Sequence, residues 1–313
     1  MNLNTTSSKS SWLAYAALAV ICVLWGTTFL GIRIGVMDIP PFLFAALRLA
    51  TAGLILSAIM LLSGKVTLPP KKVMLNQALA GFSLFTLGNG LIGVAEVHIS
   101  SGITAIICSM IPIWVTLINL GTTGDERPTI PVFLGLAIGL SGIVLMFGDN
   151  LSDFSNPAYL GSIAVIFIAN MGWSFGSVWI KRKNTNTNSN TFLNAGLQMF
   201  FGGVFLFVAS FIFDDYSAVR WTAPAIWSLV YLIVFGSVIS FACFSYAVKK
   251  LPITIVSLYA YVNPIVAVLL GTLILNETFN FRIAVSMLIT VAGIYIVNKG
   301  FQLRDLWRAQ FSR

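Results

Sequence analysis

Residues 45–56 read AALRLATAGLIL, and residues 195–206 read AGLQMFFGGVFL, 150 positions further along the chain. When the two stretches are aligned, Gly53 lies over Gly203 and Arg48 lies over Gln198. Both stretches are apolar and contain small residues, which is typical of helices that pack against one another in a membrane. The match indicates that the chain contains the same membrane-length segment twice.

Further matches keep the same order and nearly the same offset. Trp25 aligns with Trp173, and Met110-Ile111-Pro112 aligns with Val262-Asn263-Pro264. An acidic residue follows each proline, and a glycine lies sixteen positions beyond each acidic residue: Glu126 and Gly142, then Glu277 and Gly293. The shared order and spacing predict an internal duplication.

The composition indicates which solvent surrounds the chain. Hydrophobic residues make up 58% of the 313 residues and charged residues only 9%, with a mean hydropathy of +0.91. Soluble domains carry about 25% charged residues, so too few charges remain to coat a soluble surface. A helix of roughly 20 apolar residues spans a ~30 Å hydrocarbon core, and lipid offers its backbone no other partner. We predict ten membrane helices, at 13–34, 42–63, 74–96, 101–120, 130–148, 158–180, 191–213, 224–247, 253–275 and 282–299.

Basic residues indicate the orientation of these helices. If the chain crosses the membrane ten times, the side with the N-terminus holds 14 of the 18 Lys and Arg, the other side holds three, and Arg48 lies within a helix. The positive-inside rule then predicts that both termini are cytoplasmic. We interpret the net charge of +8 as part of this topology signal. No nucleic-acid partner is expected, because the sequence provides no basic face of a soluble domain.

The predicted fold is an all-α polytopic membrane protein made of two inverted five-helix repeats. The first repeat covers residues 13–148 (helices 1–5), the second covers 158–299 (helices 6–10), and 1–12 and 300–313 are cytoplasmic tails. An odd number of crossings in each repeat makes the two insert with opposite orientation, an arrangement found in secondary transporters. The first segment is expected to be a retained helix, because no A-x-A-like cleavage site follows its long apolar run.

The chain resembles the EamA family of the drug/metabolite transporter superfamily over about residues 10–300. The resemblance is carried by Trp25-Gly26-Thr27-Thr28-Phe29, by Arg48 after Pro40-Pro41, and by Asn263-Pro264 leading through Leu275-Asn276-Glu277-Thr278 to Gly293. It implies a central cavity between two repeats, open alternately to each side, with the fifth and tenth helices peripheral. It also implies a multi-pass protein of a bacterial inner (plasma) membrane, as a monomer or a homodimer, that exports amino acids, amines or other metabolites.

Polar residues recur at helical spacing within the apolar segments, for example Asn170, Ser174 and Ser177 in the sixth. Such stripes avoid lipid and face the bundle interior or a wet cavity, although polar and small residues also hold helices together. The predicted cavity-lining, substrate-binding residues are Trp25, Thr28, Arg48, Asn89, Trp173, Gln198, Tyr259 and Asn263. For each of them packing is the alternative, and for the tryptophans a lipid-facing position.

Two prolines and one arginine are candidates for special roles. Pro112 and Pro264 each remove a backbone hydrogen bond and free a carbonyl, so each is either a gating position or a static kink. Arg48 is the one charge clearly within a helix. It is expected to form an ion pair with Glu96, to meet a substrate carboxylate, or to snorkel towards the membrane surface.

The sequence also argues against several kinds of chemistry. No Asp or Glu lies in the middle of a predicted helix, so we expect facilitated export, or coupling to protons through Glu96 or His98. No Walker-type loop, metal set or disulfide framework is indicated, and neither a cofactor nor a metal is expected. A membrane enzyme would need a catalytic cluster at one interface; the sequence shows none, and the chain is not expected to be an enzyme.

The predicted cavity is apolar and aromatic with a few amides, which suits small amphipathic solutes. Aromatic faces can hold an amine, whereas the missing interior carboxylate disfavours strongly cationic solutes. Arg48 favours a solute with a carboxylate. Amino acids with neutral or aromatic side chains meet these conditions. The alternatives are a drug or amine efflux carrier and a passive solute channel.

Overall fold

The computed structural model describes residues 5–64, 66–99, 101–120, 128–147, 157–185, 189–275 and 281–311. These residues form helices joined by short connections, with no strand among them, as predicted. Glu126 and Glu277, which the internal alignment used, lie outside the described residues.

The first half of the chain contains one bent helix and one interrupted helix. A π-helical segment, η1 (Phe82–Gly90), joins α3 to α4, and the interruption at Ser109 and Met110 separates α5 from α6. The helices are α1 (Thr5–Val36), α2 (Pro41–Leu62), α3 (Lys71–Gly81), α4 (Leu91–Glu96), α5 (Ser101–Cys108), α6 (Ile111–Leu120) and α7 (Ile130–Phe147).

The second half repeats these irregularities in the same order. A π-helical segment, η4 (Leu232–Ile239), joins α10 to α11, and an interruption at Leu258 separates α12 from α13. Such π-helical segments are rare and concentrate at functional sites. The helices are α8 (Pro157–Thr185), α9 (Thr191–Phe213), α10 (Ala223–Tyr231), α11 (Ser240–Lys250), α12 (Ile253–Ser257), α13 (Tyr259–Leu275) and α14 (Phe281–Phe311), with the short turn η3 (Tyr216–Ala218) before α10.

The first and last helices extend beyond the predicted membrane segments. The α1 helix begins at Thr5, within the predicted tail 1–12, and α14 continues to Phe311, through most of the predicted tail 300–313. Hydropathy locates the part of a helix that lipid surrounds, but polar residues continue a helix outside lipid equally well. The described parts of both tails are therefore helical.

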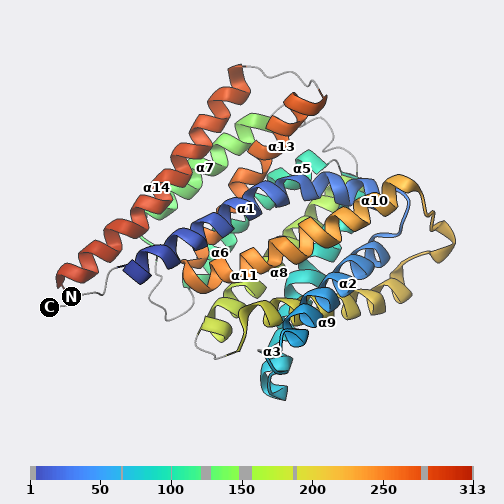
Figure 1. Ribbon diagram of the computed structural model, residues 1–313. Coiled ribbons are helices and arrows are strands. Elements are labelled where there is room, and N and C mark those ends of the chain that lie inside the picture. Colours follow the sequence, from blue (N-terminus) through green and yellow to red (C-terminus); the bar gives the residue numbers. More distant parts are fainter. Residues whose placement is uncertain are drawn as a thin grey trace.

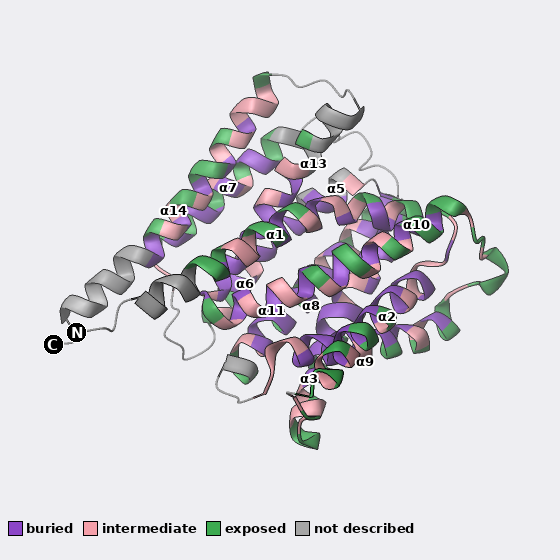
Figure 2. Cartoon of the chain, viewed as in Figure 1, coloured by how far each residue is buried: buried purple, intermediate pink, exposed green. Residues whose placement is uncertain are grey.

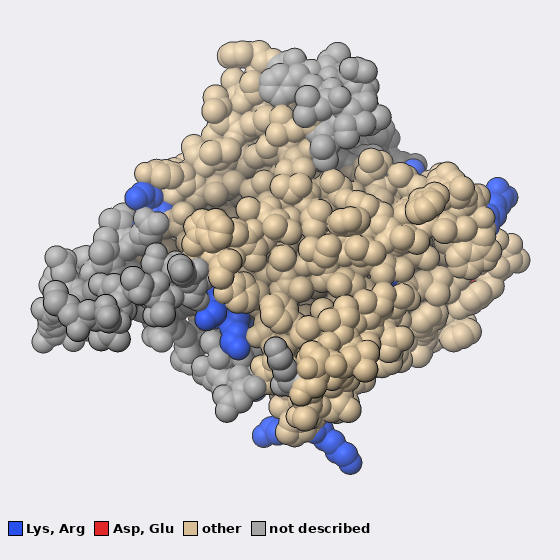
Figure 3. All heavy atoms as spheres, viewed as in Figure 1, with Lys and Arg blue, Asp and Glu red and all other residues tan. Residues whose placement is uncertain are grey.

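Within the described ranges, seven helices are long and apolar enough to cross a membrane. Shorter apolar helices lie at Ile111–Leu120, Ile130–Leu145 and Ile253–Val266. Many large apolar side chains on these helices are exposed, for example Leu54 and Leu288. Buried residues lie where helices face one another (Figure 2), and the face in Figure 3 is broadly uncharged with Lys and Arg in small groups. Lipid is the solvent that suits such a surface.

Two pairs of helices pack closely, α2 against α9 and α7 against α14 (Figure 1). A Cβ atom on Gly53 would overlap the backbone of α9, and one on Gly203 would overlap the backbone of α2. Gly142 and Gly293 make the same reciprocal approach between α7 and α14. Close contact through glycine is a common way for membrane helices to associate. The glycines that matched in the sequence thus join the first half of the chain to the second.

The α1 helix begins and α14 ends at the same end of the molecule (Figure 1). Between the two halves, the segment after α1 is bonded to the segment that precedes α10. Thr222 Oγ1 donates to Asp38 Oδ2 at 2.5 Å, and the backbone N–H of Leu43 donates to Asp214 Oδ2 at 2.7 Å. The second contact places a carboxylate at the N-terminus of α2, where backbone N–H groups lack helical partners. These bonds tie the two halves of the chain together.

Candidate functional site

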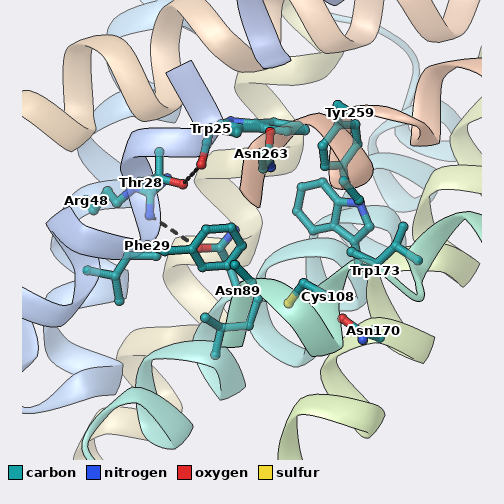
Figure 4. Close-up of a pocket in the computed structure, with 15 residues that line it drawn as sticks. Trp25, Thr28, Phe29, Arg48, Asn89, Cys108, Asn170, Trp173, Tyr259 and Asn263 are labelled. Carbon is teal, nitrogen blue, oxygen red and sulfur yellow. Dashed lines mark hydrogen bonds between the residues drawn. The ribbon is translucent and has the colours of Figure 1, made fainter. Parts of the chain in front are cut away.

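A cavity of about 50 Å³ lies inside the bundle, between α1, α2, η1, α8, α13 and the interrupted pair α5 and α6 (Figure 4). Seven of the eight predicted cavity residues line it: Trp25, Thr28, Arg48, Asn89, Trp173, Tyr259 and Asn263. The remaining lining residues are Phe29, Ile32, Ile92, Ala105, Cys108, Ile111, Asn170 and Ala260. The described lining contains no Asp or Glu.

Arg48 enters the cavity from α2 and is almost fully buried, so it does not snorkel. Its Nε donates to Ser237 Oγ at 2.9 Å, its Nη2 to the carbonyl of Gly236 at 3.2 Å, and its Nη1 to Asn89 Oδ1 at 3.3 Å. Gly236 and Ser237 belong to η4, and Asn89 belongs to η1. Both π-helical segments therefore hold the same cation. Their uncharged groups accept three of its five N–H donors without neutralising its charge.

Residues of both α1 and α2 contact one turn of η4. The carbonyl of Gly236 accepts a second hydrogen bond, from Trp25 Nε1 at 3.2 Å. A Cβ atom at Gly236 would lie 3.0 Å from Thr28 Cγ2 and 3.4 Å from Arg48 Nη2. The lack of a side chain at this position therefore allows Trp25, Thr28 and Arg48 to reach the same turn.

Aromatic rings form one wall of the cavity. The ring of Trp25 meets Trp173 and Tyr259 edge to face, with centroids 5.4 Å and 4.6 Å apart. Phe241 and Phe244 of α11, which the sequence did not single out, lie 5.1 Å and 5.3 Å from the same ring. Trp25 and Trp173 are both buried, so neither takes the lipid-facing position that was the alternative.

The interrupted helices bring polar backbone to the cavity. Pro264 lies inside α13 and supplies no N–H to the carbonyl of Ala260, and the hydroxyl of Ser109 lies 3.0 Å from that carbonyl. Pro112 lies in the first turn of α6, where a missing N–H costs no helical bond. The predicted continuous helix 101–120 is therefore interrupted just before Pro112. Pro112 lies at the start of a helix, whereas the sequence indicated a position inside one.

Asn263 and Thr28 both line the cavity and hold helices in place. With its nitrogen towards them, the amide of Asn263 donates to the carbonyls of Tyr259 at 2.9 Å and Cys22 at 3.1 Å, which links α13 to α1. The hydroxyl of Thr28 donates to the carbonyl of Trp25 in its own helix at 2.8 Å, and its Cγ2 faces Gly236 of η4. Lining and packing, which the sequence left as alternatives, occur together at these residues.

Arg48 and Glu96 attract each other electrostatically, but no direct hydrogen bond joins them in this structure. Glu96 ends α4 and is fully buried, and neither of its carboxylate oxygens has a hydrogen-bond partner among the described residues. Arg33 Nη1 on α1 is likewise buried without a partner in that part of the chain. The sequence shows opposite charges but not the π-helical segments, whose carbonyl, hydroxyl and amide groups bind Arg48 instead.

Gln198 is the one predicted residue that does not line the cavity. Its Nε2 donates to Gln77 Oε1 at 2.6 Å, and the two buried amides join α9 to α3. Helical spacing placed Gln198 on a polar face, but it could not show that a second amide on another helix satisfies it. The packing alternative applies at this position.

Known proteins resemble this chain along nearly its whole length. A sequence model of the EamA-like transporter family matches it twice, at residues 10–148 and 160–299. The inner membrane transporter YedA of Escherichia coli K12, itself uncharacterised, is 34% identical over 288 residues, which cover 91% of this chain and 90% of YedA. The uncharacterised transporter YoaV of Bacillus subtilis is 27% identical over 287 residues, which cover 91% of this chain and 97% of YoaV. A crystal structure with 18% identity matches the fold with a TM-score of 0.73, over 93% of this chain and 97% of that one.

Proposed function

Because this chain belongs to the EamA-like transporter family, we propose that it is a secondary transporter that exports amino acids or related amphipathic metabolites by alternating access. The cavity around Arg48 is the substrate site in this proposal, and the compartment is a bacterial inner membrane, as for the relative in Escherichia coli. One observation carries the proposal. A buried guanidinium, held by uncharged groups, lies beside aromatic rings in a cavity whose described lining contains no carboxylate side chain.

The proposed architecture is ten membrane crossings in two inverted five-helix repeats, 13–148 and 158–299, with both termini in the cytoplasm. Support comes from the two matches of the family model and from the order of irregularities, a π-helical segment and then an interruption in each half. The reciprocal glycine contacts between α2 and α9 also fit two related halves. Inverted repeats allow one half to rock against the other around a fixed site.

Arg48 is suited to bind a substrate carboxylate. A guanidinium has five N–H groups, and three of those of Arg48 donate to Ser237, Gly236 and Asn89. Two N–H groups remain for a ligand, counting the described residues. The charge acts in a site of low dielectric, where attraction to an anion is stronger than in water.

The aromatic wall suits the rest of an amphipathic substrate. The rings of Trp25 and Tyr259 offer apolar faces that pack against an aliphatic or aromatic side chain. The same faces attract an ammonium group. A zwitterionic amino acid with a neutral or aromatic side chain therefore fits both the charged and the apolar part of the cavity.

The cavity must widen before such a substrate fits. Its volume of about 50 Å³ is far below the ~300–1,000 Å³ of typical small-molecule pockets. The contacts that close it join the two halves of the chain: Trp25 to Gly236 and Trp173, and Arg48 to Ser237. We propose that the helices bend at η1 and η4 and at the interruptions near Pro112 and Pro264 when the cavity opens.

The structure distinguishes the two groups through which protons could be coupled to transport. His98 is exposed at the end of the segment after α4, whereas Glu96 is fully buried with both oxygens unpartnered in the described part of the chain. An ionised carboxylate without hydrogen bonds is costly in such a place, and the charges of Arg33 and Arg48 offset part of that cost. Glu96 is therefore the group through which we expect pH to act.

Counterflow in proteoliposomes tests the proposal against its alternatives. Vesicles are loaded with one unlabelled solute, and entry of the same labelled solute is followed without an ion gradient. Saturable, transient accumulation of an amino acid supports the proposal. The same behaviour with organic amines alone would indicate a drug or amine carrier, and entry proportional to concentration without counterflow would indicate a channel.

A further inference from the structure

Asn170 has a buried oxygen that faces the cavity without a partner. It lies on α8 and is fully buried, and its Nδ2 donates to the carbonyl of Ile107 at 2.8 Å. Because that carbonyl can only accept, the nitrogen must be the atom that faces it, and this fixes the orientation of the amide. Oδ1 has no hydrogen-bond partner in the described part of the chain. The oxygen therefore offers its lone pairs to whatever enters the cavity.

The unpartnered oxygen lies close to the end of α5 in Figure 4. Cys108 and Asn170 both line the cavity, and Figure 4 shows the oxygen of Asn170 directed towards Cys108 and Trp173. The oxygen of Asn170 is thus an acceptor in the lining that has no donor among the described residues.

The cavity is polarised as a result. In Figure 4 Arg48 and Asn170 lie on opposite sides of the cavity, with the ring of Phe29 between them and the rings of Trp25 and Trp173 above. Arg48 supplies N–H donors and positive charge, and Asn170 supplies an acceptor. A ligand that satisfies both has an anionic group at one end, a hydrogen-bond donor at the other, and an apolar middle.

We propose that Asn170 determines specificity, by accepting a hydrogen bond from a hydroxyl or ring N–H at the far end of a substrate whose carboxylate binds Arg48. The inference rests on the proposed function and narrows its substrates to amphipathic carboxylates with a distal donor. An analogue without that donor leaves the buried oxygen unpaired, which is expected to weaken its binding roughly 5- to 150-fold. Tyrosine and phenylalanine differ by just such a donor.

The test compares the half-saturation concentrations of labelled tyrosine and phenylalanine in counterflow. The wild-type protein is expected to favour tyrosine at least fivefold, within the range given above. Asn170→Leu is expected to bring the ratio close to one, mainly by weakening tyrosine. Asn170→Thr serves the same purpose with a smaller polar side chain, because the amide oxygen is lost while a hydroxyl remains to bond within the helix.

Asn194 provides a matched control. It is buried on α9, its Nδ2 donates to Ser189 Oγ at 2.8 Å, and its Oδ1 has no partner among the described residues, but it does not line this cavity. Asn194→Leu is expected to keep the wild-type ratio. The inference is overturned if the wild-type protein handles the two amino acids equally, or if both Asn170 variants keep the preference for tyrosine. Absence of saturable counterflow with tyrosine and phenylalanine, while another amino acid gives it, would also overturn the inference. Absence of saturable counterflow with every amino acid would instead overturn the proposed function.

Discussion

Trp25 and Trp173, which align in the two halves of the sequence, meet edge to face with ring centroids 5.4 Å apart and an angle of 83° between their planes. The contact lies in the wall of the cavity and joins α1 to α8. Residues that are equivalent in the internal alignment are thus neighbours in space. Such a contact between halves must loosen if the halves move apart, which makes the aromatic wall part of any opening movement.

We expect Trp173→Ala and Asn263→Ala each to abolish saturable counterflow while the protein remains folded. The first removes the ring that Trp25 packs against, and the second removes the amide that links α13 to α1. Expression level, elution as a single species and thermal unfolding in detergent serve as controls for folding. Wild-type kinetics in both variants would show that these residues are not part of the substrate site.

Arg48→Gln is expected to raise the half-saturation concentration for carboxylate-bearing substrates roughly 30-fold or more, because a buried charge-assisted contact is lost. Arg48→Lys keeps the charge but cannot hold Ser237, Gly236 and Asn89 in one fork, and should give an intermediate value. The exposed Arg220 provides the control, since Arg220→Gln should leave kinetics unchanged. Equal kinetics in Arg48→Gln and Arg220→Gln would contradict carboxylate binding at Arg48.

Gln198→Leu should affect stability and leave transport unchanged. It removes a hydrogen bond between buried amides and leaves Gln77 without it, at a cost of about 0.6–2 kcal/mol. Thermal unfolding in detergent measures the first effect, and counterflow per folded molecule measures the second. The double variant Gln77→Leu with Gln198→Leu should regain part of the stability, because the Gln77 oxygen that lost its donor is then removed as well. A change in substrate affinity in the single variant would indicate that Gln198 does take part in substrate binding.

The pH dependence of transport should disappear in Glu96→Gln and persist in His98→Gln. Acid neutralises the buried carboxylate of Glu96, so lowering the pH should change the wild-type half-saturation concentration in the same direction as Glu96→Gln does. His98 is exposed at the end of its segment, and its charge is screened by water. Half-saturation concentrations measured over a range of equal internal and external pH give the result. Loss of the dependence in His98→Gln alone would assign it to the histidine.

The sequence predicted where the helices lie and most of the residues that meet inside them, because the physics behind both is local. An apolar run of membrane length must be helical, and a polar residue such as Asn89 or Asn263 in such a helix must turn away from lipid. That reasoning placed seven residues around one cavity. It also pointed to Asn170 as part of a polar stripe, without giving it a role.

The sequence could not predict which partner each polar group finds. Arg48 binds two π-helical segments in place of Glu96, and Gln198 binds Gln77 in place of a ligand. Both outcomes depend on how helices distant in the chain are placed, and on a local widening of the helix that no residue pattern marks. The contacts of Phe241 and Phe244 with Trp25 were missed for the same reason, since an aromatic residue in an apolar helix looks alike whether it faces lipid or another helix.

Reaction of Cys108 with a membrane-impermeant maleimide examines the cavity directly. With Cys22 and Cys243 replaced by serine, Cys108 is the sole thiol of a chain with three cysteines, and it lines the cavity. If substrates bind beside Arg48 and the cavity opens to the surface during transport, the maleimide reacts with Cys108, and a saturating transported amino acid slows that reaction. Two results would show that the substrate path lies elsewhere. In the first, a saturating substrate does not change the rate of labelling, and in the second, Cys108 is not labelled while counterflow proceeds.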